Sequence, residues 1–347
     1  MTGDVWTYLA SCEKPIILYG MGNGADKILS VFECYGITCS GVFASDGFVR
    51  GQAFHGMTVE SYAAVSRRLD DFIVVVSFAS RLPDVIENVM RIAAERELYI
   101  PDVPVVFDGD LFNREFYENH RADLENVRAL FADDESKAVF DDIIEYRLSA
   151  RPDPLFRHTA DRADVVKNIL SFEKYASCVD AGAYVGDTLA ELCSYTAPEF
   201  ILALEPDVKN FRKLSAFCEN RPGFHAVNSG AWDKEEVLTF NTGAGRGSVI
   251  SAKGKGEVQM TSIDIALGGR SVDYIKYDVE GAEYKALLGS RGTICNFSPD
   301  LCVSLYHRSE DIFVLPLLVR EMNPAYRFYL RRYRCMPAWE IDLYAIT

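Results

Sequence analysis

The chain has 347 residues, 49% hydrophobic and 12% aromatic, so it carries enough apolar material for packed cores and is long enough for two domains. Its formal net charge of −15 argues against nucleic acid as a partner, because an acidic surface repels phosphate backbones. The longest apolar runs, near residues 72–79 and 312–319, are far shorter than the ~20 residues that a membrane-spanning helix needs.

The nine cysteines include no C-x-x-C pair and no Cys/His group with metal-ligand spacing, so the sequence predicts no cysteine-based metal site. Their odd number is typical of a reducing compartment rather than of a disulfide-bonded secreted protein. The N-terminus shows no basic region followed by a long apolar core. We therefore expect a cytoplasmic protein without a membrane span; the sequence leaves homo-oligomer formation open.

The first 109 residues alternate between predicted strands and predicted helices, which indicates a doubly wound parallel sheet. An apolar strand runs from Pro15 into the glycine-rich loop Gly20-Met-Gly22-Asn-Gly-Ala25 and a helix. The elements expected after it are strand 38–44, helix 59–69, strand 72–77, helix 83–97 and strand 103–107. We expect this part to form an N-terminal Rossmann-like domain.

Residues 110–175 show no strand signal. Apolar residues instead recur at helical spacing over 124–131 and 139–148, and Arg151-Pro-Asp-Pro154 is expected to end the second helix. This pattern predicts a helical connector packed against one or both flanking domains.

Residues 176–347 show a second alternation of strands and helices. The expected strands are 177–180, 200–205, 224–229, 272–277 and 301–305, followed by two alternating segments, 326–333 and 341–346, that are close enough to pair antiparallel. A hairpin of 237–240 with 248–251 is expected between the third and fourth of these strands. The prediction is a sheet of five parallel strands with a terminal antiparallel pair.

Ligands of open α/β sheets bind at the carboxyl ends of the strands, where the strand order reverses. In the second sheet, polar residues and glycines gather at these ends, which predicts a binding site there. The predicted cofactor-binding residues are Asp180, Gly182, Tyr184, Gly186, Glu205, Ser229, Trp232 and Asp278. The predicted catalytic residues are Asp278, Glu280 and His307.

Each of these predictions has a chemical reason. Gly182 and Gly186 let the backbone approach a ligand closely, and the Glu205 carboxylate can accept hydrogen bonds from both hydroxyls of a ribose. Asp278 and Glu280 can hold a cationic sulfonium or amino group, accept a proton from a hydroxyl, or bind a divalent cation through oxygen. The residues alone do not separate these roles, and Glu283 is as well explained by helix initiation.

Four segments resemble the motifs of the FkbM-type methyltransferase family, in the family's order over roughly residues 176–306. They are Val179-Asp-Ala-Gly-Ala-Tyr-Val-Gly-Asp-Thr188, Leu204-Glu-Pro206, Thr261-Ser-Ile-Asp264 and Ile275-Lys-Tyr-Asp-Val-Glu-Gly-Ala-Glu283. The last is the most distinctive. The first departs from the family, because Tyr184 stands where an asparagine is usual.

The resemblance implies a class I methyltransferase fold, with a Rossmann-like sheet, and methyl transfer from S-adenosylmethionine. The implied acceptor is a hydroxyl oxygen, often on a sugar or a sugar-bearing natural product. By position, Asp180, Gly182 and Glu205 correspond to cofactor residues, and Asp278 to a cofactor or catalytic residue. The expected layout is therefore an N-terminal domain (1–109), a connector (110–175) and a methyltransferase domain (176–347).

The N-terminal loop supports an alternative. Gly20-x-Gly22-x-x-Ala25 fits the dinucleotide fingerprint, and Asp46 follows the second strand. A working site there would make the protein an oxidoreductase or a recognition protein that binds NAD or a nucleotide-sugar. No nearby tyrosine–lysine or cysteine–histidine pair suggests hydride chemistry, which favours a recognition or assembly role. The arginines at 327, 331, 332 and 334 are expected to line a solvated strand edge.

Overall fold

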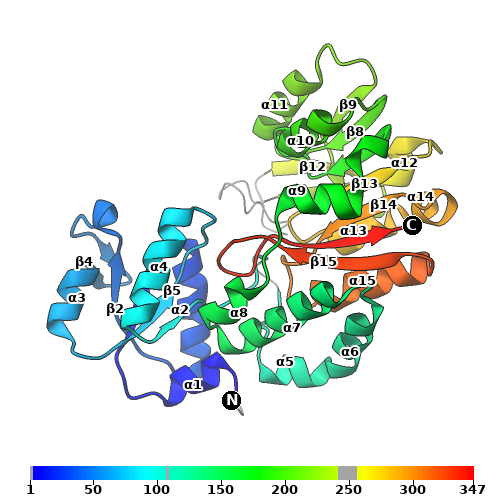
Figure 1. The fold of residues 1–347 in the computed structure, drawn as a ribbon. Coiled ribbons are helices and arrows are strands. Elements are labelled where there is room, and N and C mark those ends of the chain that lie inside the picture. The colour runs from blue at the N-terminus through cyan, green and yellow to red at the C-terminus, as the bar shows by residue number, and fades with distance from the viewer. Residues whose placement is uncertain (1–2, 107–108, 241–255) are drawn as a thin grey trace.

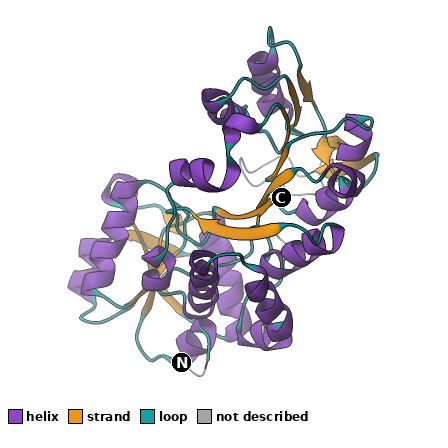
Figure 2. Cartoon of the chain, turned by 45° about the vertical axis from the view of Figure 1, so that its right-hand side comes forward, coloured by secondary structure: helices purple, strands orange, loops and turns teal. Residues whose placement is uncertain are grey.

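The computed structural model describes residues 3–106, 109–240 and 256–347. Figure 1 shows two sheets lying next to each other, with the chain between them folded into helices. In Figure 2 both sets of strands lie between layers of helices. The predicted fold class, a class I sheet preceded by a second Rossmann-like sheet and a helical connector, is confirmed.

The N-terminal sheet has the strand order β3-β4-β2-β1-β5-β6, and all neighbours are parallel except β3 and β4. Its strands are β1 (Ile16–Tyr19), β2 (Cys39–Ala44), β3 (Ala53–Phe54), β4 (Met57–Ser61), β5 (Ile73–Val76) and β6 (Leu98–Tyr99). Its helices are α1 (Val5–Ser11), α2 (Asn23–Tyr35), α3 (Tyr62–Arg68) and α4 (Pro83–Glu95), with a 3-10 turn, η1 (Asp46–Phe48).

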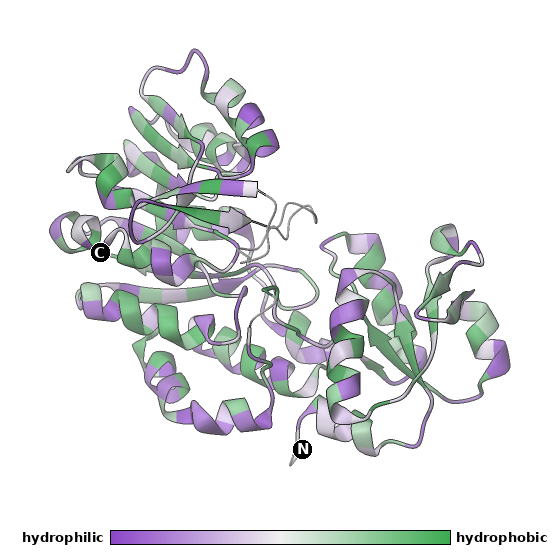
Figure 3. Ribbon diagram, turned by 180° about the vertical axis from the view of Figure 1, so that it is seen from behind, coloured by the Kyte–Doolittle hydropathy of each residue, from purple (hydrophilic) through white to green (hydrophobic). Residues whose placement is uncertain are grey.

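Strands β1 and β5 are apolar throughout because both faces of this sheet are covered. Side chains of a strand alternate between the two faces, and here Ile17 and Tyr19 join one hydrophobic core while Ile16 and Leu18 join another. Figure 3 shows the contrast between these apolar strands and the polar outer surfaces of the helices. A continuous apolar run is therefore the pattern that such a parallel strand needs.

One predicted helix of this part starts too early, and one predicted strand is wrong. The start of the predicted helix 59–69 belongs to strand β4, and the helix begins only at Tyr62. No strand is assigned to the described part of 103–107; β6 ends at Tyr99 and the chain from 101 to 106 is irregular. That segment leaves the sheet to cross toward the C-terminal sheet, where Val105 N–H donates to the His307 carbonyl oxygen at 3.2 Å.

The segment between the sheets is helical, as predicted. It comprises α5 (Arg114–Asn119), α6 (Arg121–Leu130), α7 (Asp134–Ser149), α8 (Pro152–Arg157), α9 (Arg162–Val165), the π-helix η2 (Val166–Leu170) and the 3-10 helix η3 (Phe172–Lys174). Helix α7 ends before Pro152, whose ring cannot continue it and instead begins α8.

The C-terminal sheet has the order β15-β16-β14-β13-β7-β8-β9. Its strands are β7 (Ser177–Ala181), β8 (Phe200–Leu204), β9 (Phe224–Val227), β13 (Tyr274–Tyr277), β14 (Asp300–Ser304), β15 (Arg327–Arg332) and β16 (Ile341–Ile346). Five are consecutive parallel strands, and β16 lies antiparallel between β14 and β15. The chain order reverses between β7 and β13, which places the crevice for a ligand at their carboxyl ends.

The remaining helices of this half are α10 (Asp187–Tyr195), α11 (Val208–Cys218), α12 (Ile263–Leu267), α13 (Glu283–Leu288), α14 (Arg291–Phe297) and α15 (Asp311–Met322). A small sheet, in the order β10-β12-β11, comprises β10 (Gly230–Ala231), β11 (Glu236–Phe240) and β12 (Gly256–Thr261). The predicted hairpin is thus corrected in its second strand: β11 pairs with β12, and residues 248–251 lie outside the described ranges.

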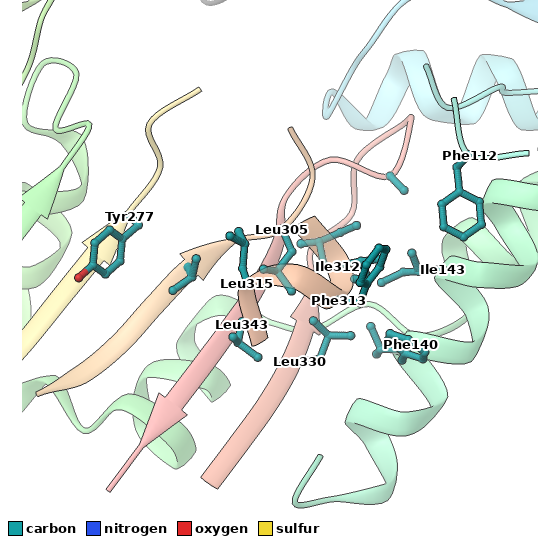
Figure 4. Packing of buried hydrophobic residues seen from close by; sticks show 14 of the residues in the cluster. Phe112, Phe140, Ile143, Tyr277, Leu305, Ile312, Phe313, Leu315, Leu330 and Leu343 are labelled. Atoms are coloured by element: carbon teal, nitrogen blue, oxygen red, sulfur yellow. The ribbon is translucent and has the colours of Figure 1, made fainter. Parts of the chain in front are cut away.

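The helices α6 and α7 pack on the β15 side of the C-terminal sheet. Phe112, Phe140 and Ile143 of the connector share one hydrophobic core with Ile312, Phe313 and Leu330, as Figure 4 shows. The connector also supplies a hydrogen-bond partner to the outer edge of β15, because the Ser136 hydroxyl accepts a hydrogen bond from Leu330 N–H at 2.9 Å.

The prediction of a solvated arginine edge is wrong for two of its four residues. Arg331 and Arg332 are buried, because α7 covers the strand edge that carries them. Arg331 forms ion pairs with Asp133 at 2.7 Å and Glu135 at 3.0 Å, so its charge is compensated by the connector. All nine cysteines are described and are free thiols. No helix among the described residues is long and apolar enough to cross a bilayer.

A buried ion pair links the connector to the crossing segment 101–106. Arg147 of α7 is 1% exposed; its Nε lies 3.0 Å from Asp102 Oδ2, and it also donates to the Ser309 carbonyl oxygen at 3.2 Å. We predict that Arg147→Leu lowers the free energy of unfolding by about 3–5 kcal/mol, because Asp102 is left buried without its partner.

Urea denaturation measures this loss, and Arg128→Leu is the matched control on α6. The Arg128–Asp141 pair is bidentate at 2.7 Å but about half exposed, so its removal should cost less than about 1 kcal/mol. Equal losses in the two variants would contradict the structural role assigned to Arg147.

Candidate functional site

The predicted site residues converge at the crevice between the carboxyl ends of β7 and β13. Asp180 lies within β7 and Gly182 follows it, Glu205 follows β8, Asp278 follows β13, and His307 follows β14. Asp278 N–H donates to the carbonyl oxygen of Ala181 at 3.0 Å, so the end of β13 is fixed against the end of β7. The five residues come from four neighbouring strands of one sheet.

The loop after β7 is held in a conformation that requires glycine. Gly182 has a φ of +86°, and a Cβ atom there would lie 1.9 Å from the carbonyl oxygen of Asp278. Gly186 has a φ of +90° and comes immediately before α10. Tyr184, between them, is also left-handed, with a φ of +48°, and its side chain is partly exposed. The loop thus brings its backbone directly against the Asp278 strand end.

Glu205 organises this loop through backbone hydrogen bonds. Its Oε2 accepts from Tyr184 N–H at 3.0 Å, and its Oε1 accepts from Asp207 N–H at 2.8 Å. The side chain is buried, and burial raises the pKa of Glu205 to about 7 although both backbone hydrogen bonds favour the ionised form. Each carboxylate oxygen retains a lone pair for a ligand hydroxyl.

Asp180 and Asp278 lie on either side of a buried lysine. Lys276 Nζ lies 3.6 Å from Asp180 Oδ1 and 3.5 Å from Asp278 Oδ2. Burial alone would lower the pKa of Lys276, but the two carboxylates raise it above its usual range. Asp180 also accepts a hydrogen bond from the Thr188 hydroxyl, and Asp278 accepts one from the Tyr306 hydroxyl at 3.2 Å. Burial raises the pKa of Asp278, but Lys276, His307 and Tyr306 outweigh it and hold that pKa below its usual value.

His307 is fully buried and surrounded by carboxylates. Its Nδ1 lies 3.0 Å from Glu283 Oε1, and its Nε2 lies 3.7 Å from Asp278 Oδ1 and 3.5 Å from Glu280 Oε2. Burial alone would lower the pKa of His307, but Glu283, Asp278 and Glu280 together raise it to about 10. One ligand atom each from Asp278, Glu283 and His307 lies within 4.8 Å of the others, a spacing compatible with a metal ion.

Ser229 and Trp232 lie beside β10, on the small sheet next to the crevice. The Ser229 hydroxyl is buried and donates to the Gln259 carbonyl oxygen at 2.8 Å. The backbone N–H of Trp232 donates to the Thr261 carbonyl oxygen at 2.8 Å. The ammonium group of Lys285 lies 5.7 Å from the centroid of the Trp232 ring. Ser229 therefore has a structural hydrogen bond in place, and its predicted cofactor role stays a prediction.

The sequence did not indicate one wall of this site. Val106, from the segment that crosses from the N-terminal sheet, is buried against Gly281, where a Cβ atom would lie 2.5 Å from its Cγ1. Lys27 of α2 donates to the carbonyl oxygens of Pro104 and Val105 at 2.8 and 2.6 Å. No periodicity in 101–106 could reveal these contacts, since they are made by an irregular segment with residues remote in the chain.

The N-terminal loop of the alternative interpretation has the expected glycine geometry. Gly20 and Gly22 have φ values of +112° and +113°, and α2 begins at Asn23. Asp46 follows β2 and is exposed. Whether this loop binds a nucleotide stays a prediction.

The close contact at Gly182 generates a stability prediction. Gly182→Ala should lower the free energy of unfolding by more than the ~1–2 kcal/mol of left-handed strain alone, because the new methyl group collides with the Asp278 carbonyl. Gly36→Ala is the control: Gly36 has a φ of +67° but open space around it. Urea denaturation of both variants tests this, and a loss at Gly182 no larger than at Gly36 would refute it.

Comparison with known proteins gives two findings. Residues 180–334 match the model of the methyltransferase FkbM domain. The crystal structure of methyltransferase FkbM from Methylobacillus flagellatus KT is 18% identical, with a TM-score of 0.74 over 96% of this chain and 90% of that chain. At that identity the likeness shows the fold alone, and it extends to the N-terminal sheet.

Two further solved structures are less similar. Aeropyrum pernix fibrillarin with natively bound S-adenosyl-L-methionine is 9% identical, with a TM-score of 0.34 over 50% of this chain and 68% of that chain. N-methyltransferase NodS from Bradyrhizobium japonicum WM9 is also 9% identical, with a TM-score of 0.33 over 53% and 90%. Likenesses this low carry no argument, and no curated protein sequence matches the chain. The match over residues 180–334 confirms the resemblance of the C-terminal part of this chain to the methyltransferase FkbM domain.

Proposed function

We propose that this protein transfers a methyl group from S-adenosylmethionine to a hydroxyl oxygen of a small molecule, with a sugar or a sugar-bearing natural product as the acceptor class. The FkbM domain over residues 180–334 supports methyl transfer. The observation that carries the proposal is the convergence of the Gly182 loop, Glu205 and Asp278 at the crevice where the strand order reverses.

In this proposal the cofactor lies across the carboxyl ends of β7 and β8. Glu205 accepts hydrogen bonds from the two ribose hydroxyls, with its own position fixed by Tyr184 and Asp207. The Gly182–Gly186 loop admits the cofactor close to the backbone, and the carboxylates of Asp180 and Asp278 attract its cationic end.

The reaction itself needs positioning more than covalent help. The acceptor oxygen attacks the methyl carbon, the methyl–sulfur bond breaks with its electron pair left on sulfur, and S-adenosylhomocysteine is released. The hydroxyl proton passes to a carboxylate of the enzyme. In-line placement of this kind supplies about 7–11 kcal/mol of the barrier lowering.

The exposure of the three candidate catalytic side chains separates their roles. Asp278 and Glu280 are 32% and 40% exposed, so both can contact an acceptor, whereas His307 is 1% exposed and lies behind them. We therefore assign proton acceptance to Asp278 or Glu280, and to His307 a positioning role. We propose that residues 1–109 and the connector 110–175 form part of the acceptor-binding site, because Val106 lies against Gly281.

Cofactor binding tests this function directly. Isothermal titration calorimetry should show that S-adenosylmethionine binds and that Glu205→Ala weakens it about 10- to 100-fold, since hydrogen bonds to a charged group contribute about 1.5–3 kcal/mol. Asp46→Ala is the matched control, because Asp46 follows β2 as Glu205 follows β8, and affinity should not change. Binding of NAD in place of S-adenosylmethionine, lost in the Asp46 variant, would instead establish the N-terminal alternative.

The raised pKa of Glu205 predicts a pH-dependent affinity. The ionised carboxylate is the better acceptor, and with a pKa of about 7 it becomes protonated as the pH falls below 7. Affinity for S-adenosylmethionine should therefore fall by up to about tenfold per pH unit below 7 and level off above it. Calorimetry between pH 5 and 8 measures this, and Glu205→Gln should bind weakly with no such slope; a slope that persists in this variant would exclude Glu205 as its origin.

A further inference from the structure

We propose that Asp278, Glu280 and His307 bind one divalent metal ion, with Glu283 orienting the imidazole ring from behind. The inference deepens the proposed function, on which its catalytic meaning rests, by adding a cation that holds the acceptor oxygen. The site itself stands on the geometry of the side chains and can be tested without cofactor or acceptor.

The first argument is the spacing of the three ligand atoms. His307 Nε2 lies 3.7 Å from Asp278 Oδ1 and 3.5 Å from Glu280 Oε2. Both distances exceed the 2.7–3.2 Å of ordinary N–H···O hydrogen bonds. Two ligand atoms, each about 2.1 Å from one metal ion, lie roughly 3.0–3.4 Å apart in octahedral or tetrahedral geometry. Each of the two distances from Nε2 is within a few tenths of an ångström of that range, so a small shift of either acidic side chain would bring its oxygen and Nε2 to the separation of two ligands on one ion.

The second argument is an unpartnered nitrogen in the interior. His307 is fully buried, and within the described ranges neither ring nitrogen makes a hydrogen bond; Nδ1 has the Glu283 carboxylate 3.0 Å away, whereas no carboxylate oxygen of Asp278 or Glu280 comes closer to Nε2 than 3.5 Å. Buried polar atoms are nearly always paired, so one directed between two carboxylates indicates that something else occupies the space. A metal ion accounts for this arrangement, because it accepts the Nε2 lone pair and both carboxylates together.

The third argument is the position of Glu283. Its side chain is fully buried, its Oε1 lies 3.0 Å from His307 Nδ1, and the same oxygen accepts Val279 N–H at 2.8 Å. Because this carboxylate is beside Nδ1, it lies on the other edge of the ring from Asp278 and Glu280. A carboxylate on the second nitrogen of a metal-binding histidine fixes the ring orientation and leaves the other nitrogen free for the metal.

Among the described residues, Lys276 and Tyr306 are the neighbours of Asp278 that decide how an ion could approach the site. Lys276 Nζ contacts Oδ2 of Asp278 at 3.5 Å, whereas His307 Nε2 faces Oδ1. The lysine therefore does not occupy the space between His307 and Oδ1. The Tyr306 hydroxyl donates to Asp278 Oδ1 at 3.2 Å. Asp278 and Glu280 are 32% and 40% exposed, so an ion can reach them from the crevice, and the remaining coordination positions face the acceptor.

The ligand set limits the kind of ion and acceptor. One imidazole with two carboxylates suits divalent ions that accept both nitrogen and oxygen, such as Mn²⁺. A hydroxyl bound to such an ion loses its proton more readily, and the Glu280 carboxylate oxygen that does not hold the ion accepts that proton. A sugar with neighbouring hydroxyls can fill two coordination positions at once.

Manganese binding to the full chain tests the site. Mn²⁺ is titrated into protein in 150 mM salt, and unbound Mn²⁺ is followed by its electron paramagnetic resonance signal. We expect one site per chain, an affinity at least about tenfold lower in Glu280→Gln, and no specific site in His307→Gln. His55→Gln is the control: His55 also contacts a carboxylate, Asp26 at 2.7 Å, but that pair is exposed and its loss should change nothing.

The outcomes separate the metal site from the methyltransferase function. Absence of a stoichiometric Mn²⁺ site in the wild-type protein, or equal binding in the wild type and all three variants, would overturn the metal site. Urea denaturation of the metal-free variants checks that they are folded, and Glu280→Gln keeps the test valid if His307→Gln is unstable. Mn²⁺ binding without any S-adenosylmethionine binding would leave the metal site standing and refute the proposed function.

Discussion

Asp180 and Asp278 belong to adjacent parallel strand ends, and the buried Lys276 lies between them. Lys276 is opposite Asp180 in the β7–β13 register, and its ammonium group is within 3.6 Å of both carboxylates. In a buried setting, two unscreened negative charges would repel each other strongly. The positive charge of Lys276 therefore favours an arrangement in which the Gly182 loop, the end of β13 and the carboxylates around His307 lie in one crevice.

The crevice is held by backbone contacts as much as by side chains. The Asp278 carbonyl lies where a Cβ of Gly182 would be, and both oxygens of Glu205 accept backbone N–H groups from two different loops. Such contacts leave little freedom for the strand ends to move independently. A site with its donors and acceptors fixed before the ligand arrives spends less binding energy on ordering itself.

Hydrophobic periodicity and strand-end chemistry predicted five parallel strands with a terminal antiparallel pair, the helical connector and the residues that meet at the crevice. These features are local in origin, since each depends on a short run such as β5 and the polar residue after it. The burial of Arg331 and Arg332, and the approach of Val106 to Gly281, depend on segments far apart in the sequence. Periodicity shows which face of an element is covered, but it does not show which remote segment covers it.

The environment of His307 also had to come from the structure. From the sequence, Glu283 was equally well explained by helix initiation, because acids are favoured in the first turn of a helix. In the structure its carboxylate points inward to His307 Nδ1, and it is the most buried of the three acids around that ring. Glu283 can thus stabilise the start of helix α13 through its negative charge and also hold the His307 ring in position.

The crossing segment 101–106 carries a consequence for any attempt to divide the protein. It takes its position from the N-terminal sheet through Lys27, yet Val105 N–H donates to the His307 carbonyl oxygen. A fragment cut at the start of β7 would keep every strand of the C-terminal sheet and lose one side of its crevice. Exchange of the N-terminal halves between relatives would for the same reason alter the shape of the proposed acceptor site. Residues that precede the C-terminal sheet in the chain therefore help to form the site of that sheet.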